Sequence, residues 1–594
     1  PWEAGLATWK ELAPWEALGA RARAAETLAR TRDVRALPLL ERRYLLARKP
    51  HRLLDRYLLS SSLAAHFAAA EEGREEVSRW LRKVKRKDPW FAYNAYLVIA
   101  GQGGTEEVAR VALSTKGSTL LRAAAIEALG VRGDPRRSAE VLRELLGRRR
   151  ISRDRLGRRL LTGACASATL NLHQRAPREV SAPLVESLIA VLERKKKSSR
   201  RVIALINAHL AKLFQVDPPQ DPKASFWRAQ AAAAPAKEEA EQEASPAPKR
   251  TRTRAPAPAP EATTFMGISS EGERIVYLID MSDSMLLPLS PEEKESLRRP
   301  MTGSDPSGSK RQEAQIPWDR VHTRFDAVRE FLKLSLRSMS GRAAYAVIGF
   351  GSSAKCLNST PRLIPARAEL RAATIEELDG IQARGVSTRG KYGTLRGRTN
   401  LHAALRLAFQ LTTQNPIEGD DEHVNPKSLE GGCDTIFLLS DGTPTQWDFH
   451  GRGPDKLYPA QNIEARKYTA RSRNSETGEL HEVEVDQPAR NIPARRAPQS
   501  AVGPYSKINH FRADLARLNL FRKAAIHVVG VGEYSRTWLE LVAEGGQGRL
   551  RLVGSGQAKE DTAPRGDIIR EKKRLMREAR ERKEEERRRR REER

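Results

Sequence analysis

Short apolar runs in the C-terminal half of the chain alternate with stretches of helical periodicity, and this alternation limits the fold more than any other feature. The runs are rich in Val, Ile and Leu, and each is long enough for one buried strand: RIVYLID from Arg274, AAYAVIGFG from Ala343, CDTIFLLSDG from Cys433 and AAIHVVGVG from Ala524. A later run, GRLRLV, continues the series. Because strands that are apolar on both sides must be covered on both faces, the pattern predicts a doubly wound, mostly parallel sheet between helices.

The N-terminal part, residues 1–230, is rich in Ala, Leu and Arg at helical spacing with short breaks. Two stretches resemble each other: ARAAETLARTRDVRALPLLERRYL near residue 22, and LRAAAIEALGVRGDPRRSAEVLRELL from Leu121. In each, a helix with small Ala residues runs into a turn that contains Asp, and a Leu-rich helix follows. Such a pair cannot bury its apolar face alone, so neighbours must stack. The two stretches resemble HEAT repeats of an α-solenoid.

Composition divides the rest of the chain. At 594 residues it is too long for one ordinary core. Residues 231–262 contain Ala-Pro alternation and charges, which predicts an extended, semi-rigid linker. Residues 561–594 are nearly all Arg, Lys and Glu, which predicts a coiled coil, a solvated helix or a disordered tail. The predicted order is a HEAT-like domain at 1–230, the linker, a sheet domain at 263–560 and the tail.

Oxygen-bearing side chains follow two of the predicted strands and open one helix. Asp280, Ser282 and Ser284 follow RIVYLI as D-x-S-x-S, Asp441 follows TIFLLS, and Thr399 opens a helix after a long loop. Ligands of doubly wound sheets bind beyond the carboxyl ends of the strands, so we expect these side chains to meet there. Such oxygens suit a hard cation, Mg²⁺ (or Mn²⁺ or Ca²⁺). The hydroxyls can ligate directly and the carboxylates directly or through water, which leaves one position for an incoming oxygen.

The D-x-S-x-S after the first strand, the Thr of TN and the Asp of SDG resemble the metal-ion-dependent adhesion site (MIDAS) of von Willebrand factor A-type (VWA) domains. The resemblance spans roughly residues 270 to 556 and implies a Rossmann-like sheet with one antiparallel edge strand. It also implies metal-mediated binding rather than catalysis. By this resemblance the metal ligands are Asp280, Ser282, Ser284, Thr399 and Asp441.

Three long insertions distinguish the chain from compact VWA domains. They cover residues 286–322, 384–398 and 446–507, and we expect all three at the metal face, where they can form a partner-specific surface or a lid. The last contains ARKYTARSRNSETGELHEVEVDQ, which predicts a hairpin around SETG.

The leading hypothesis is a non-enzymatic scaffold whose VWA-like domain binds an Asp or Glu carboxylate of a protein partner through Mg²⁺. One alternative is a metal-dependent phosphohydrolase with Asp280 as nucleophile, although the haloacid-dehalogenase pattern needs a second Asp where Ser282 stands. The other alternative is binding of nucleic acid or an acidic surface through the basic tail, because the formal net charge is +30.

Other residues place weaker limits on the kind of protein and on its compartment. Three Cys residues without a CxxC pair indicate neither a disulfide framework nor a cysteine zinc site. No apolar run approaches the ~18 residues of a membrane span. The chain opens on Pro1 rather than Met, so a cleaved leader and an extracytoplasmic location are compatible with it, and the compartment stays open. We expect His527 to be a core histidine and His402 to be a surface residue.

Overall fold

The computed structural model describes the chain with gaps. Described are residues 1–12, 18–33, 35–40, six positions between 57 and 66, 88–148, 151–193, 200–216, 219, 223–243, 263–270, 272–282, 285, 288–298, 316–351, 353–381, 399–418, 421–440, 508–532 and 534–554, with the strand residues between 457 and 496.

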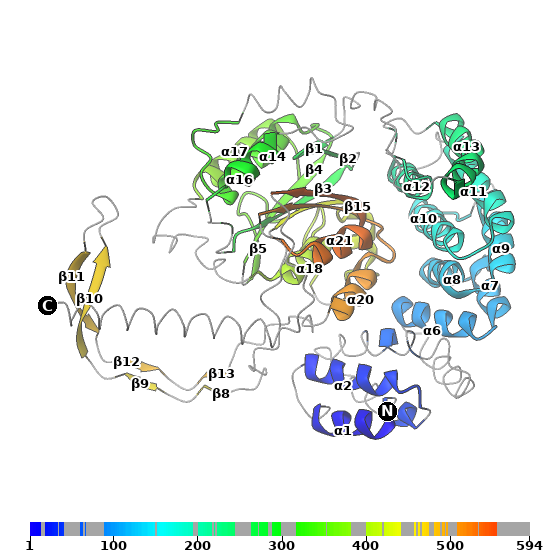
Figure 1. Cartoon of the computed structure of the whole chain (residues 1–594), viewed down its shortest axis with the longest axis horizontal. Helices are drawn as coiled ribbons and strands as arrows, with labels where there is room; N and C mark the ends of the chain where they lie inside the picture. Colours follow the sequence, from blue (N-terminus) through cyan, green and yellow to red (C-terminus); the bar gives the residue numbers. More distant parts are fainter. Residues whose placement is uncertain are drawn as a thin grey trace. The chain divides into compact units, whose positions relative to one another are not determined.

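The chain is a mixed α/β protein with two compact units (Figure 1). The first, called the helical unit below, consists of Pro1–Arg254, Asn400–Asp434 and Thr445–Ala524. The second, called the sheet unit, consists of Ala255–Thr399, Thr435–Pro444 and Ala525–Arg594. The helical unit therefore combines the N-terminal helices with segments from the C-terminal half of the sequence.

The sheet unit is built on a mostly parallel sheet that contains every strand predicted from the apolar runs. In its described part the order is β15-β14-β7-β3-β4-β5, with β6 paired to β4. Five strands run parallel to one another: β15, β14, β7, β3 and β4. The other two, β5 and β6, run antiparallel to β4. Its strands are β3 (Arg274–Asp280), β4 (Ala344–Phe350), β5 (Ala354–Cys356), β6 (Ile364–Pro365), β7 (Thr435–Ser440), β14 (Ala525–Val531) and β15 (Gln547–Val553).

The strand order places a topological switch between β3 and β7. If β6 is left out and the six other strands are renumbered in the order of the chain, the order from β5 to β15 is 3-2-1-4-5-6. Strands 1 and 4 of this numbering are β3 and β7. The connections leave these two strands in opposite directions, an arrangement that opens a crevice at their carboxyl ends. The register aligns Ile279 of β3 with Leu439 of β7, so Asp280 and Ser440 end adjacent strands.

Helices cover the sheet because its strands are apolar on both sides. One face packs through Tyr277 and Phe437 against α16 (Arg324–Ser338), and the Tyr277 hydroxyl lies 2.7 Å from Ser335 Oγ. Thr323 and Asp326 form a capping box that fixes the start of α16. The same unit contains β1 (Thr263–Phe265), β2 (Ile268–Ser270), α14 (Pro291–Arg298), α17 (Ala368–Asp379) and α21 (Arg536–Gly545).

The first predicted insertion, 286–322, contains a helix that is tied to the sheet unit. Glu293 of α14 accepts hydrogen bonds from Arg324, and both side chains are buried. Arg551 of β15 donates to the carbonyls of Ser296 and Leu297 at the C-terminal end of α14. Together these contacts make α14 a fixed part of the fold.

The helical unit consists mainly of antiparallel helices joined by short turns (Figure 1). The stretch from Leu121 lies in α8 and α9, and Asp134 caps α9 by accepting from Arg137 N, so the predicted helix–turn–helix is confirmed there. Among the described residues its helices are α1 (Trp2–Leu12), α2 (Leu18–Arg30), α6 (Pro89–Gly101), α7 (Thr105–Leu113), α8 (Thr119–Arg132), α9 (Pro135–Gly147), α10 (Arg155–His173), α11 (Arg178–Glu193), α12 (Arg200–Leu213), α13 (Ala224–Glu243), α18 (Leu401–Gln410), α19 (Pro426–Gly431) and α20 (Ile508–Asn519).

The predicted extended linker at 231–262 is wrong over its first part. Helix α13 continues to Glu243, because the sequence there is dominated by Ala, Glu, Gln and Lys, which have high helix propensity. The longest Ala-Pro alternation behind the prediction, APAPAP, begins at Ala255, and residues 244–262 lie outside the described part of the chain.

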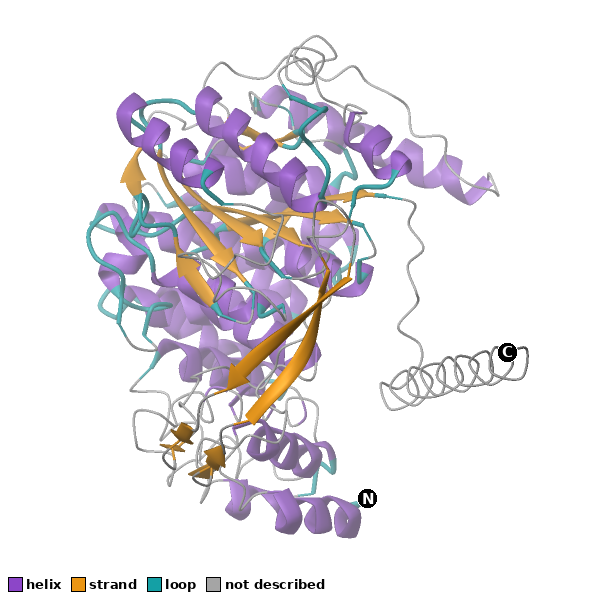
Figure 2. Cartoon of the chain, turned by 90° about the vertical axis from the view of Figure 1, so that its left-hand side faces the viewer, coloured by secondary structure: helices purple, strands orange, loops and turns teal. Residues whose placement is uncertain are grey.

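A long antiparallel arm occupies the third insertion (Figure 2). The predicted hairpin is confirmed as β10 (Arg466–Arg473) paired with β11 (Leu480–Gln487), while its SETG tip is outside the described residues. The same register continues, without a shift, through β9 (Gln461–Ile463) with β12 (Arg490–Ile492) and β8 (Leu457–Tyr458) with β13 (Arg495–Arg496).

Close packing of α8 on α10 gives a first prediction. A Cβ built on Gly130 would lie 2.4 Å from Ala168 Cα, whereas one on Gly147 at the end of α9 meets nothing within 4 Å. We expect Gly130→Ala to lower the free energy of unfolding by about 1–3 kcal/mol, because backbone rather than a flexible side chain must move. Gly147→Ala is the matched control and should change it by less than about 0.5 kcal/mol. Equal denaturation midpoints for the two variants would contradict this packing.

Two buried histidines give a second prediction. Burial lowers the pKa of His209 in α12 and of His527 in β14 to about 3. Above the unfolded pKa of about 6.5 both are neutral in either state, and below it only the unfolded chain binds the proton, so stability falls as pH decreases. Each histidine should lower the free energy of unfolding by about 1.4 kcal/mol when the pH falls from 7.5 to 5.5, as measured by chemical denaturation.

The matched variants keep the hydrogen bonds and remove the titration. Gln at position 209 can replace Nε2, which lies 3.3 Å from Ser167 Oγ, and Asn at position 527 can replace Nδ1, which accepts from Arg549 N. His209→Gln and His527→Asn should each flatten the pH dependence. An unchanged slope would show that these imidazoles are not neutral in the folded chain. The expectation that His527 is a core histidine is confirmed.

Candidate metal centre

The carboxyl ends of β3 and β7 bring one predicted ligand, Asp280, into direct contact with a residue that was not predicted, Ser440. Asp280 and Ser440 are both fully buried, and the Ser440 hydroxyl donates to Asp280 Oδ2 at 2.5 Å. The other carboxylate oxygen, Oδ1, accepts from the backbone N–H of Ser282 at 2.9 Å. The carboxylate is therefore oriented from two sides at the topological switch of the sheet, where α/β folds bind ligands.

The remaining predicted ligands are partly within the described residues. Ser282 and Thr399 are buried, with relative exposures of 1% and 3%. Thr399 directly precedes Asn400, whose side chain caps α18 by accepting from Ala403 N at 3.1 Å. Ser284 and Asp441 lie outside the described residues, although the neighbour of Asp441, Ser440, ends β7 at the switch.

The donor set suits a hard divalent cation held largely by hydroxyls. Among the described residues no three His, Cys, Asp or Glu side chains are grouped so as to hold a metal ion. Of the predicted ligands within the described residues, Asp280 is the carboxylate, and Ser282 and Thr399 carry neutral hydroxyls. Because both oxygens of Asp280 already accept hydrogen bonds, its geometry suits a carboxylate that holds a metal-bound water rather than a bidentate ligand.

No pattern in the sequence singles out Ser440, although its hydroxyl donates to Asp280. It ends an apolar strand in the run LLSDG, where one Ser before the Asp is compatible with many roles. Only the parallel register of β3 with β7 identifies it as the residue opposite Asp280. A buried carboxylate needs such donors, because an uncompensated charge in the interior is very costly.

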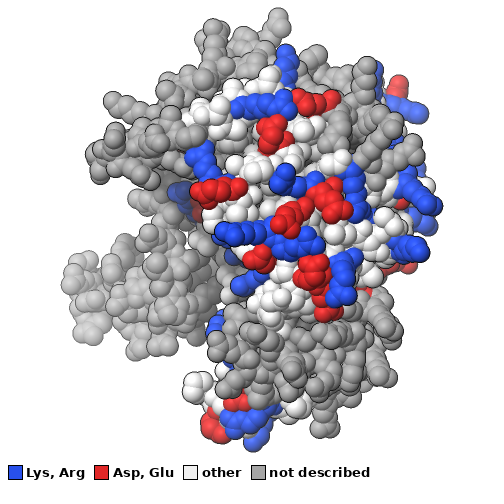
Figure 3. Space-filling view, turned by 90° about the vertical axis from the view of Figure 1, so that its right-hand side faces the viewer, with Lys and Arg blue, Asp and Glu red and all other residues white. Residues whose placement is uncertain are grey.

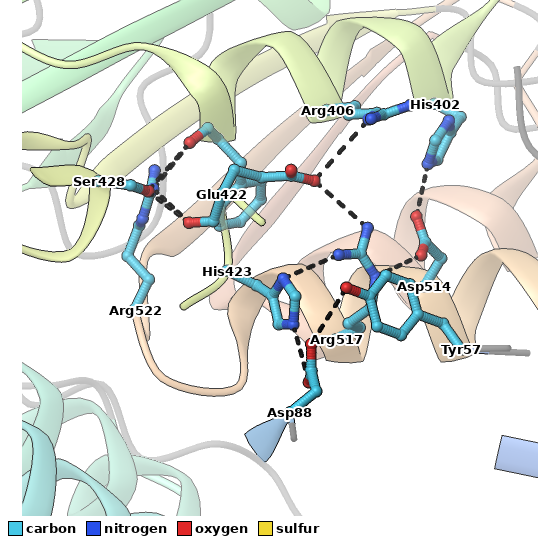
Figure 4. A network of polar contacts seen from close by, with 11 residues as sticks. Tyr57, Asp88, His402, Arg406, Glu422, His423, Ser428, Asp514, Arg517 and Arg522 are labelled. Atoms are coloured by element: carbon cyan, nitrogen blue, oxygen red, sulfur yellow. Dashed lines mark hydrogen bonds and ion pairs between the residues drawn. The ribbon is translucent and has the colours of Figure 1, made fainter. Parts of the chain in front are cut away.

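A second polar cluster, in the helical unit, was not predicted (Figure 4). His402 is buried, not at the surface as expected, and its Nε2 lies 2.8 Å from Asp514 Oδ2. Arg517 donates to Asp514 at 2.8 Å and to Glu422 at 3.3 Å. Burial by itself raises the pKa of Asp514, but Arg517 and His402 outweigh it and hold the pKa below its usual value. The two long-range contacts, His402 with Asp514 and Arg517 with Glu422, join residues 95 or more positions apart, so no local sequence pattern predicts them.

The cluster continues to residues of the N-terminal helices. His423 Nε2 lies 3.5 Å from Asp88 Oδ1, and the Tyr57 hydroxyl donates to Asp88 Oδ2 at 3.2 Å. The Arg517 guanidinium lies over the Tyr57 ring, 4.5 Å from its centroid. Burial raises the pKa of the Tyr57 hydroxyl, so Tyr57 is a neutral donor. We interpret the cluster as an internal contact rather than a catalytic site, because none of its described residues is an exposed nucleophile.

The described surface shows no large patch of one charge on the face drawn in Figure 3, where basic and acidic side chains are interspersed. Several basic side chains of the described residues are paired with acids: Arg137 contacts Glu106 and Glu140, and Arg228 contacts Glu186. The face drawn in Figure 3 therefore adds no support for nucleic-acid binding, and the tail lies outside the described residues. Within the described part, no helix is both long and apolar enough to span a membrane.

Comparison with known proteins adds no family: no protein-family model matches the chain, and no curated protein matches it.

The Asp280–Ser440 contact gives a third prediction. Ser440→Ala removes a hydrogen bond to a buried charged group, so we expect the free energy of unfolding to fall by about 1.5–3 kcal/mol. The control is Ser338→Ala, at the end of α16, where the hydroxyl donates to the carbonyl of Ser335. That variant should change stability by less than about 0.5 kcal/mol in chemical denaturation. Similar losses in both would show that Ser440 does not hold Asp280.

Proposed function

We propose that the chain is a non-enzymatic interaction protein in which a VWA-like domain binds a carboxylate of a protein partner through a divalent metal. The metal is Mg²⁺, or Mn²⁺ or Ca²⁺, and its proposed ligands are Asp280, Ser282, Ser284, Thr399 and Asp441. The observation that carries the proposal is the buried, doubly hydrogen-bonded Asp280 at the switch between β3 and β7.

The sheet supports this proposal beyond the site. Its order, 3-2-1-4-5-6, and its antiparallel β5 are those that the VWA resemblance implies. The N-terminal helices resemble a HEAT-type array in their Ala-lined contacts, and in the Asp that caps the second helix of the α8–α9 pair. Arrays of this kind present extended surfaces, so the helical unit suits a scaffold.

The chain's own residues would act on the metal in two ways. The hydroxyls of Ser282, Ser284 and Thr399 would bind it without neutralising its charge, while Asp280 and Asp441 would hold its waters or ligate it. The metal, when bound, supplies an electrophilic position for an incoming oxygen. With few direct carboxylates it stays attractive to an Asp or Glu of the partner. This arrangement favours binding of a carboxylate.

The fourth prediction is a metal titration. We expect Mg²⁺ to bind the wild-type chain in calorimetry, and Thr399→Ala to weaken binding about tenfold or more because a direct ligand is lost. Asp441→Asn, which removes a charge at nearly constant shape, should do the same. The matched control is Asp319→Asn, since Asp319 is 79% exposed in the same unit. Wild-type binding that survives both site variants would contradict the ligand set.

A hydrolysis assay separates this function from the phosphohydrolase alternative. The proposal expects no turnover of para-nitrophenyl phosphate with Mg²⁺ present. Turnover that is lost in Asp280→Asn, in a chain that still folds, would instead make Asp280 a nucleophile.

A further inference from the structure

The N-terminal helices contact the C-terminal segment of the helical unit through charge pairs of one polarity. Glu26 of α2 lies 2.7 Å from His510 Nε2, and Glu127 of α8 lies 2.7 Å from Lys523 Nζ. Asp88, which caps α6, lies 3.5 Å from His423. In all three pairs the acid comes from the N-terminal helices. The bases His510 and Lys523 come from the segment Thr445–Ala524, whereas His423 comes from Asn400–Asp434. We call Glu26, Asp88 and Glu127 the acidic row.

Three contacts of the segment that carries α20 follow the order of the chain, whereas the Asp88–His423 pair does not. Going from Glu26 through Tyr57 to Glu127 along the N-terminal helices, the partners are His510, Arg517 and Lys523 in turn. His510 and Arg517 are seven residues apart on α20, which is roughly 10.5 Å along a helix axis. Packed helices lie about 8–10 Å apart, so bases at this interval can each contact a different helix.

The contact is buried and includes apolar side chains. Leu520 and Phe521, directly after α20, belong to the same hydrophobic core as the N-terminal helices. Glu26 and His510 are each 6% exposed, and Glu127 is 4% exposed. Burial raises the pKa of Glu127 against the opposing effect of Lys523. Removing one partner of such a pair leaves an uncompensated buried charge, so the pairs select which helix fits.

We propose that the N-terminal helices are a receptor for a basic helix, and that α20 of the same chain occupies this receptor. The recognised feature is a segment with two basic side chains seven residues apart on α20, His510 and Arg517, followed by an apolar end and Lys523. It is set against Glu26 and Glu127 of the acidic row, with Tyr57 between them. The receptor is independent of the metal centre, so neither proposal depends on the other.

Charge exchange in the full chain tests the occupancy. Glu127→Lys and Lys523→Glu should each speed amide hydrogen exchange in α20 by about tenfold or more, and the double variant should restore protection. The control is the same exchange at the exposed pair Glu186 and Arg228, which should leave α20 unchanged. If a charge-reversed variant does not fold, Glu127→Gln and Lys523→Met replace it as the single variants. The chain that carries both substitutions then serves as the double variant in the same comparison. Unchanged exchange in the single variants, or no restoration in the double, would overturn the proposal.

A peptide tests the receptor itself. A labelled peptide of residues 506–525 should bind the full-length Lys523→Glu chain at least tenfold more tightly than the wild type, whose receptor is occupied. Adding Glu127→Lys to that chain should abolish binding, because the peptide's own Lys523 then meets a Lys. Fluorescence anisotropy measures both. Binding that is equal in all chains, or absent from the Lys523→Glu chain, would overturn a receptor for basic helices.

Discussion

The parallel pairing of β3 with β7 is the interaction on which the candidate metal centre depends. Because their register aligns Ile279 with Leu439, the polar residues that end the two strands must meet, although they are 160 positions apart in sequence. The strand order reverses at this pair, so the connections diverge and leave the carboxylate of Asp280 at the base of a crevice. The hydrogen bonds from Ser440 and Ser282 then satisfy a charge that burial would otherwise make very costly.

A comparable constraint shapes the helical unit, where buried charges occur in compensated groups. Asp514 and Glu422 share Arg517, and His402 completes the surroundings of Asp514. Replacing such groups by apolar side chains is often neutral or stabilising, so their presence is a weak argument for stability. They are better explained as determinants of which helix packs where, because a misplaced helix would leave acids and bases buried without partners.

The sequence predicted those features that are encoded locally. Apolar runs located the strands of the sheet, and the turn residues of SETG located β10 and β11, because period and turn chemistry act over a few residues. Ser440 and His402 were missed or misplaced for the opposite reason: their partners, Asp280 and Asp514, are distant in sequence, and one Ser or His has no periodicity. The error at α13 arose where Ala-rich composition was read together with the Ala-Pro alternation that follows it.

The position of Asp514 within α20 adds an argument about register. It lies between His510 and Arg517, so the helix presents base, acid and base at intervals of about one turn. A slip of α20 by one turn, roughly 5.4 Å, would bring Asp514 toward Glu26 or Asp88 and take His510 and Arg517 from their partners. Like charges brought together in a buried contact are strongly unfavourable, so the slipped arrangement is excluded by repulsion as well as by lost pairs. A uniformly basic helix would bind the same acids without this discrimination, and the interior acid therefore makes the seven-residue spacing selective.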